Sequence, residues 1–193
     1  MEFLSVVEKR RSIRKFLDKQ ISDSDLEKIL YSGSLAPNAG GGQRTKLLAI
    51  QNKEMLDKLG NLNASSMKGV KLSGRAYVSS EQPSIIDNPN IKNGFYNAQT
   101  VVAIFSPKDF LYGEADAFCV AENMLLEATN LSLASCVVAR GIETFENLYG
   151  QSIKEKYNID QNWICRCFVL LGYIDGPYPK SKHIRDGRII IVK

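Results

Sequence analysis

Apolar residues recur along the chain at two different spacings, which predict a mixture of helices and strands. Residues 2 to about 10 carry apolar side chains at helical intervals and predict a short amphipathic helix. A second helix should begin at Ser22, a capping residue, and run to about Leu30, and a third should begin after Asn52. Residues 114–130 are apolar at 3.6-residue spacing with almost no polar face, so this helix should be buried nearly all round.

Short runs of β-prone residues predict the strands of a sheet. Residues 101–105 form a continuous apolar run, which is typical of a central strand covered on both faces. Residues 61–94 have no clear period. Their portion at 83–94 is rich in turn formers, so we expect a surface segment there and consider it a candidate lid. Further strands are expected at 46–50, 163–171 and 188–192.

Length and composition bound the class of protein. A chain of 193 residues with 44% hydrophobic and 24% charged residues suits one soluble domain that spans residues 1–193. No apolar run reaches the roughly 18 residues of a membrane-spanning helix, and no signal-peptide pattern is present. We therefore expect a cytoplasmic protein without a membrane partner. The net charge of +4 is modest and its basic residues gather at both ends, which does not favour a nucleic-acid partner.

The cysteines and the single histidine limit the chemistry. Cys165 and Cys167 alternate within an apolar strand pattern, where cysteine behaves as a small hydrophobic residue. No C-x-x-C pair occurs and the only histidine is His183, so we expect no metal site. The same shortage of histidine removes most Ser-His-Asp and Cys-His arrangements.

The densest group of hydrogen-bond donors is the basic cluster at residues 9–16, with the sequence K-R-R-S-I-R-K-F. Three guanidinium groups and a hydroxyl within five residues suit a phosphate or a carboxylate, because arginine presents a planar fork to paired oxygens. Ile13 and Phe16 interrupt the charges, which suggests an extended segment that docks while Ser12 and Arg14 point the other way. A solvated basic turn is the alternative interpretation.

A glycine loop at residues 36–43, with the sequence A-P-N-A-G-G-G-Q, is a second candidate binding element. Three consecutive glycines allow positive φ angles and let a ligand lie against bare backbone. The loop matches neither the G-x-G-x-x-G nor the Walker A pattern. A flexible turn is the alternative interpretation here.

Taken in order, these features resemble the FMN-dependent nitroreductase family. The resemblance spans nearly the whole chain and implies an α+β sandwich, with a mostly antiparallel central sheet flanked by helices. It also implies an obligate homodimer that holds two FMN molecules at its interface. The matching features are R-R-S-I-R-K-F at 10–16, A-P-x5-Q at 36–43, the strand region from Ala98, the buried helix from Asp116, and L-G-Y at 171–173 with basic residues behind it.

The resemblance implies which residues bind FMN. Arg10 and Ser12 would hold its phosphate, and Arg14 would face the pyrimidine edge, where a cation stabilises the negative charge of the reduced flavin. The basic residues at 180–182 would form a second set of contacts with the phosphate. Arg140 stands where the family has a glycine near flavin N5, and it would either donate a side-chain hydrogen bond or face solvent. The implied set is Arg10, Arg11, Ser12, Arg14, Pro37, Asn38, Gln43, Arg140, Lys180 and Lys182.

The implied reaction needs no catalytic side chain, since flavin N5 carries the chemistry. NAD(P)H would pass a hydride to the flavin and leave, and a nitroaromatic, a quinone or a related electron-poor acceptor would then take the electrons by a ping-pong mechanism. One alternative is a non-catalytic flavin carrier or sensor on the same scaffold. Another is a protein that uses both basic clusters to bind a nucleic acid or an acidic partner.

Overall fold

Four antiparallel strands form the central sheet in the part of the chain that the computed structural model describes, residues 1–66, 79–181 and 184–193. Their order across the sheet is β1-β2-β4-β3, and every neighbouring pair is antiparallel. The prediction of an α+β fold with a mostly antiparallel sheet is therefore confirmed. The strands are β1 (Lys46–Ile50), β2 (Thr100–Pro107), β3 (Ala134–Val138) and β4 (Trp163–Gly172).

Strand β2 is the centre of the sheet, as its sequence predicts. It lies between β1 and β4, and its residues from Thr100 to Phe105 are completely buried. The strand presents Val102 and Ile104 to one hydrophobic core, and Val101, Ala103 and Phe105 to the other. A β-branched and aromatic run without polar alternation is what a strand covered on both faces requires.

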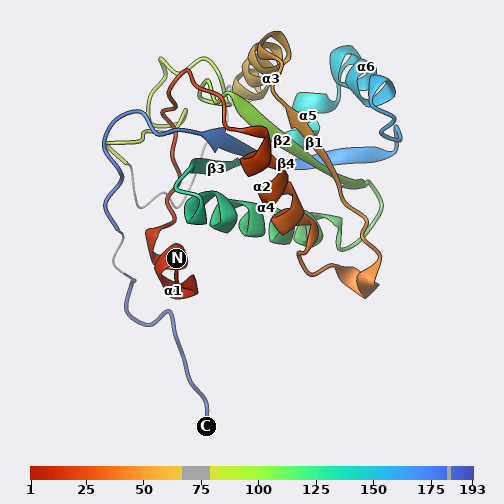
Figure 1. Ribbon diagram of the computed structural model, residues 1–193. Coiled ribbons are helices and arrows are strands. Elements are labelled where there is room, and N and C mark those ends of the chain that lie inside the picture. Colours follow the sequence, from red (N-terminus) through yellow and green to blue (C-terminus); the bar gives the residue numbers. More distant parts are fainter. Residues whose placement is uncertain (67–78, 182–183) are drawn as a thin grey trace.

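Helices cover both faces of the sheet (Figure 1). Helices α2 (Asp23–Ser34) and α4 (Gly113–Asn130) share one core with the sheet. Helices α3 (Lys53–Ser65), α5 (Gly141–Phe145) and α6 (Leu148–Lys156) share the other. Helix α1 (Phe3–Lys9) contacts α4, and a short 3-10 turn, η1 (Ala39–Gly41), lies in the glycine loop.

The predicted helix starts are confirmed by side-chain caps. The Ser22 hydroxyl accepts a hydrogen bond from the Asp25 backbone N–H at 3.1 Å, and the Asn52 side chain accepts one from the Met55 N–H at 2.9 Å. Helix α2 continues to Ser34, four residues beyond the expected end. Its extension lies against α4, so packing outweighs the weak helix propensity of the serines and glycine there.

Helix α4 is only partly buried, so the expectation of burial nearly all round is wrong for the chain by itself. Ala117, Val120 and Met124 face the sheet and are almost completely buried. Glu122 and Phe118 are exposed, Phe118 by 38%. No helix among the described residues is long and apolar enough to cross a bilayer.

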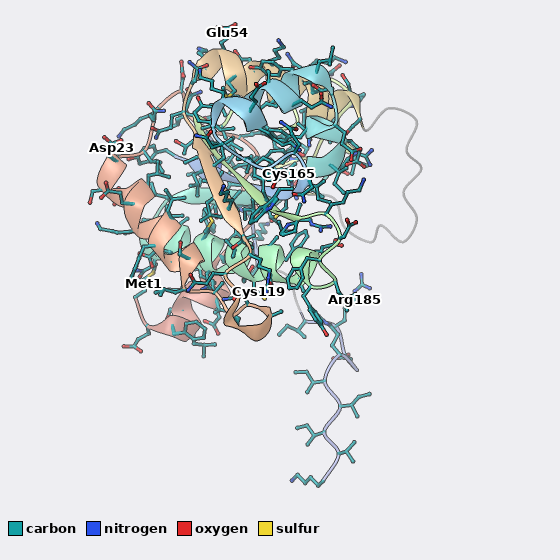
Figure 2. The ribbon with its side chains drawn as sticks, turned by 90° about the vertical axis from the view of Figure 1, so that its right-hand side faces the viewer. Met1, Asp23, Glu54, Cys119, Cys165 and Arg185 are labelled. Carbon is teal, nitrogen blue, oxygen red and sulfur yellow. The ribbon has the colours of Figure 1, made fainter. Side chains whose placement is uncertain are left out.

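The C-terminal tail, residues 188–193, forms no strand, so that expectation is also wrong. Its four apolar residues, Ile189 to Val192, are between 75% and 91% exposed. Figures 1 and 2 show the chain beyond Arg185 projecting away from the body. A β-prone run becomes a strand only when a neighbouring backbone supplies its hydrogen bonds, and no described part of this chain lies beside the tail.

Candidate functional site

The N-terminal segment, residues 12–16, is docked along the edge of the sheet. Ser12 forms a parallel bridge with Ser135 of β3, and Phe16 forms an antiparallel bridge with Ile174. The Ile13 N–H donates to the Ser135 carbonyl oxygen at 2.9 Å. Ile13 and Phe16 are buried, at 1% and 8% exposure. The alternating apolar positions therefore anchor the segment as the sequence pattern predicts.

Arg11 ties the two basic regions together through backbone oxygens. Its Nη1 donates to the carbonyl oxygens of Glu8 and Arg10, at 2.6 and 2.8 Å. Its Nε donates to the Lys180 carbonyl oxygen at 3.3 Å. The Tyr178 hydroxyl also donates to a backbone oxygen in α1, at 2.7 Å. The structure thus places Lys180 beside the first basic cluster, while Lys182 lies outside the described residues.

Arg10, Ser12 and Arg14 all influence the pKa of one buried thiol. Burial raises the pKa of Cys136, and the positive charge of Arg14, a hydrogen bond with Ser12 and the positive charge of Arg10 all act in the opposite direction. Arg10 also lies 3.9 Å from Glu122 of α4, with both side chains partly exposed. An exposed ion pair of this length contributes little to the stability of the fold, so Arg10 can exchange Glu122 for a ligand.

A cavity of about 640 Å³ opens beside Arg14. Asp57 and Asn61 of α3 line a second side, and the segment at 83–97, which includes the candidate lid, lines a third. Its volume lies within the range of roughly 300–1,000 Å³ that small-molecule sites occupy. Tyr96 lies in this wall, where burial raises the pKa of its hydroxyl and the charge of Arg14 lowers it. The cavity is polar and open to solvent.

The glycine loop lies elsewhere in the same chain. The Asn38 side chain accepts a hydrogen bond from the Gln43 N–H at 2.8 Å, and Asp116 of α4 accepts one from the Ala39 N–H at 3.0 Å. Gly40 has a φ of 60°, a left-handed conformation that favours glycine. Pro37, Asn38 and Gln43 do not line the Arg14 cavity, and Figure 1 shows η1 well apart from the segment at 79–97.

Arg140 follows β3 and has a left-handed backbone with a φ of 66°. Its Nε donates to the Ser66 hydroxyl at 2.8 Å, and its Nη2 lies 3.3 Å from Glu143. Buried Asn63 donates to the Ala139 carbonyl oxygen at 3.1 Å and so fixes the preceding peptide. The Arg140 side chain is therefore held by the protein and does not simply extend into solvent.

Sequence patterns did not point to Gln82. It is completely buried, and its side-chain oxygen accepts the Arg14 backbone N–H at 2.7 Å. It lies in the part of the chain that has no apolar period, so no spacing rule marks it. In the described residues, no group of three or more histidine, cysteine, aspartate or glutamate side chains has the arrangement of a metal site.

Comparison with known proteins yields one family and several related structures. The sequence model described as "Nitroreductase family" matches residues 7–173. A protein of Archaeoglobus fulgidus named "Putative NADH dehydrogenase/NAD(P)H nitroreductase" is 47% identical over 58 residues, which is 30% of this chain. That match spans only about a third of the relative's own length, 33%.

Two solved structures resemble the whole chain. A nitroreductase with bound FMN from Bacteroides fragilis superposes with a TM-score of 0.81 at 25% sequence identity, over 100% of both chains. A nitroreductase with bound FMN from Desulfitobacterium hafniense superposes with a TM-score of 0.82 at 21% identity, over 100% of this chain and 99% of the other. At this level of identity, the second similarity concerns the fold alone.

Proposed function

The chain belongs to the nitroreductase family, and on that premise we propose that it is an FMN-dependent oxidoreductase. The observation that carries the proposal is the docked N-terminal segment, which bears Arg10, Ser12 and Arg14 along β3 and brings Arg14 to the wall of a cavity of small-molecule size. The FMN bound in the Bacteroides fragilis structure supports the choice of cofactor.

The residues present fit the phosphate of FMN. Within the described ranges, the Arg10 side chain is engaged only by the long contact with Glu122, and Lys180 is held beside Arg11. Arg14 makes no ion pair within the described residues, so its charge is available to a ligand. We propose that Arg10 and Ser12 hold the phosphate, with Lys180 and Lys182 as a second grip. Arg11 would act mainly by fixing the backbone around them.

The proposed reaction needs no proton transfer by a side chain. When bound, FMN would supply hydride chemistry between NAD(P)H and an electron-poor acceptor such as a nitroaromatic or a quinone. Arg14 would stabilise negative charge that develops beside it, and its partial burial strengthens that effect relative to water. Reductant and acceptor would use the same cavity in turn, and this predicts ping-pong kinetics.

We propose that a homodimer completes the site. Within one chain the glycine loop lies away from Arg14. Pro37, Asn38 and Gln43 would therefore reach a flavin bound beside Arg14 only from a second copy. Helix α1 presents Phe3 and Leu4 at 72% and 66% exposure, which is costly for a monomer in water.

The edge of the sheet and the tail support the same assembly. Among the described residues, β1 pairs only with β2, so its outer edge has unpaired backbone groups. Leu47 and Leu48 of this strand are only half-buried. An open apolar edge favours the addition of another strand, and the C-terminal tail of a second copy has the apolar, β-prone sequence to supply it.

The visible spectrum of the purified protein is the direct test. We expect a yellow protein whose flavin absorption is bleached by NAD(P)H and restored by a quinone, with parallel lines in double-reciprocal plots. Riboflavin should bind much more weakly than FMN, because charge-assisted contacts to the phosphate are the strongest available. Equal affinity for the two would contradict the phosphate site. A yellow protein that NAD(P)H does not bleach would favour the carrier or sensor alternative.

A further inference from the structure

Gln82 is a buried polar residue with an unusual number of contacts. Its exposure is 0%, whereas glutamine side chains are mostly exposed in folded proteins. A carboxamide in such a place is destabilising unless its donors and acceptor are all used. The backbone N–H of Gln82 donates to the Ser79 hydroxyl at 3.0 Å, so the backbone at this position is fixed as well.

The other partners of Gln82 are Arg14 and Asp175, which both line the cavity. Its Oε1 accepts the Arg14 backbone N–H at 2.7 Å, and its carbonyl oxygen accepts Nη1 of Arg14 at 3.2 Å. Its Nε2 donates to the Asp175 carbonyl oxygen at 3.4 Å. The Asp175 backbone N–H in turn donates to the Lys15 carbonyl oxygen at 2.9 Å. One residue therefore fixes both the backbone and the guanidinium of Arg14.

The contacts that hold Arg14 are neutral. Arg10 faces Glu122 and Arg140 faces Glu143, but the described residues place no carboxylate in an ion pair with Arg14. The Gln82 backbone carbonyl oxygen accepts from the guanidinium, its carboxamide accepts from the Arg14 backbone N–H, and neither group cancels the charge. A carboxylate in place of the carboxamide would still accept the Arg14 N–H but would put a negative charge close to Arg14.

We propose that Gln82 is a positioning residue, which aims the Arg14 guanidinium at the bound cofactor and keeps its positive charge uncompensated. This inference rests on the proposed function, since it concerns the cofactor of that same site. Gln82 itself need not touch the flavin. Its effect is on how strongly Arg14 favours the reduced, more negative form of the flavin over the oxidised form.

Two variants separate the effect of the Gln82 side-chain hydrogen bonds from the effect of an added charge. Gln82→Glu keeps the size and an acceptor for the Arg14 N–H but adds a negative charge beside the guanidinium. Gln82→Met has a similar volume, adds no charge and removes the side-chain hydrogen bonds. Gln151→Glu makes the same chemical change at an exposed position on α6 and serves as the control.

The readouts are the midpoint potential of the bound flavin, the FMN dissociation constant from fluorescence quenching, and amide hydrogen exchange of residues 12–16. In Gln82→Glu we expect the preference for reduced over oxidised flavin to fall about tenfold, which is a shift of about 30 mV for a two-electron couple. In Gln82→Met we expect faster exchange at Arg14 and a weaker FMN affinity. Gln151→Glu should match the wild type in all three measurements.

The possible failures are distinguishable. A wild-type chain that binds no FMN would overturn the proposed function and this inference with it. Wild-type FMN binding, together with an unchanged potential in Gln82→Glu and unchanged exchange at Arg14 in Gln82→Met, would overturn this inference alone. If Gln82→Met does not fold, the potential of Gln82→Glu relative to Gln151→Glu decides by itself. A purely structural role for Gln82 would lower thermal stability in both variants and leave that potential unchanged.

Discussion

Removal of residues 188–193 is predicted to weaken the proposed dimer strongly. The tail exposes four large aliphatic side chains by 75% to 91%. Complete burial of each would contribute about 1.5–3 kcal/mol, so one tail offers at most roughly 6–12 kcal/mol. Ordering these four apolar residues as a strand opposes this by about 1–2 kcal/mol per residue, or roughly 4–8 kcal/mol in all. At the lower end of both ranges the remainder is about 2 kcal/mol per tail, which for both tails corresponds to roughly a thousandfold change in the dimer dissociation constant.

Sedimentation velocity over a range of protein concentrations measures this constant directly. Lys193→Ala is the matched control, because it alters the tail but leaves its apolar residues in place. Since the glycine loop would reach Arg14 only from a second copy, the truncated chain should also lose FMN at concentrations where it is monomeric. A truncated chain that dimerises with the same constant as the Lys193→Ala variant would refute the proposed role of the tail.

Four further predictions concern the site and the core. Arg10→Ala should weaken FMN binding about 10- to 100-fold through loss of a charge-assisted contact, and Lys15→Ala much less, as measured by fluorescence quenching. Asn63→Ala should lower the free energy of unfolding in urea by about 2 kcal/mol, because two hydrogen bonds from its buried Nδ2 are lost. The three buried thiols should resist alkylation at pH 8 until the protein is unfolded, as mass spectrometry can show. Burial raises the pKa of Cys167 to about 12, so the folded chain retains a proton that the unfolded chain releases above about pH 9, and the free energy of unfolding should fall as pH rises from there towards 12.

The core of the fold could be predicted because the relevant signals are local. The uninterrupted apolar run at 101–105 and the capping residue Ser22 each act through their own neighbours in sequence. The tail could not be placed in the same way. Its residues have the pattern of a strand, but the pattern does not say whether a pairing backbone exists in the same chain.

The docking of the basic segment was predictable, but its individual contacts were not. The donors of the basic cluster predict an anion site, which stays a prediction, and the alternation of Ile13 and Phe16 predicts that the segment docks, which the structure confirms. Sequence alone cannot show that Arg11 directs Nε and Nη1 to backbone oxygens, because those oxygens come from distant or non-periodic parts of the chain. Gln82 was missed for the same reason, since its role is defined by a contact 68 residues away.

The contact between Arg11 and Lys180 joins residues 169 positions apart, and so does the contact between Lys9 and Tyr178. At about 5–20 residues per second, the ribosome needs roughly 10–30 s to make the second partner after the first. The basic segment therefore leaves the ribosome well before these partners, with its charges exposed and its apolar anchors without their final neighbours. It can make both contacts only after residue 180 has been synthesised. Cofactor capture in the cell should accordingly follow translation, and a chain interrupted before residue 174 should be unable to retain the flavin.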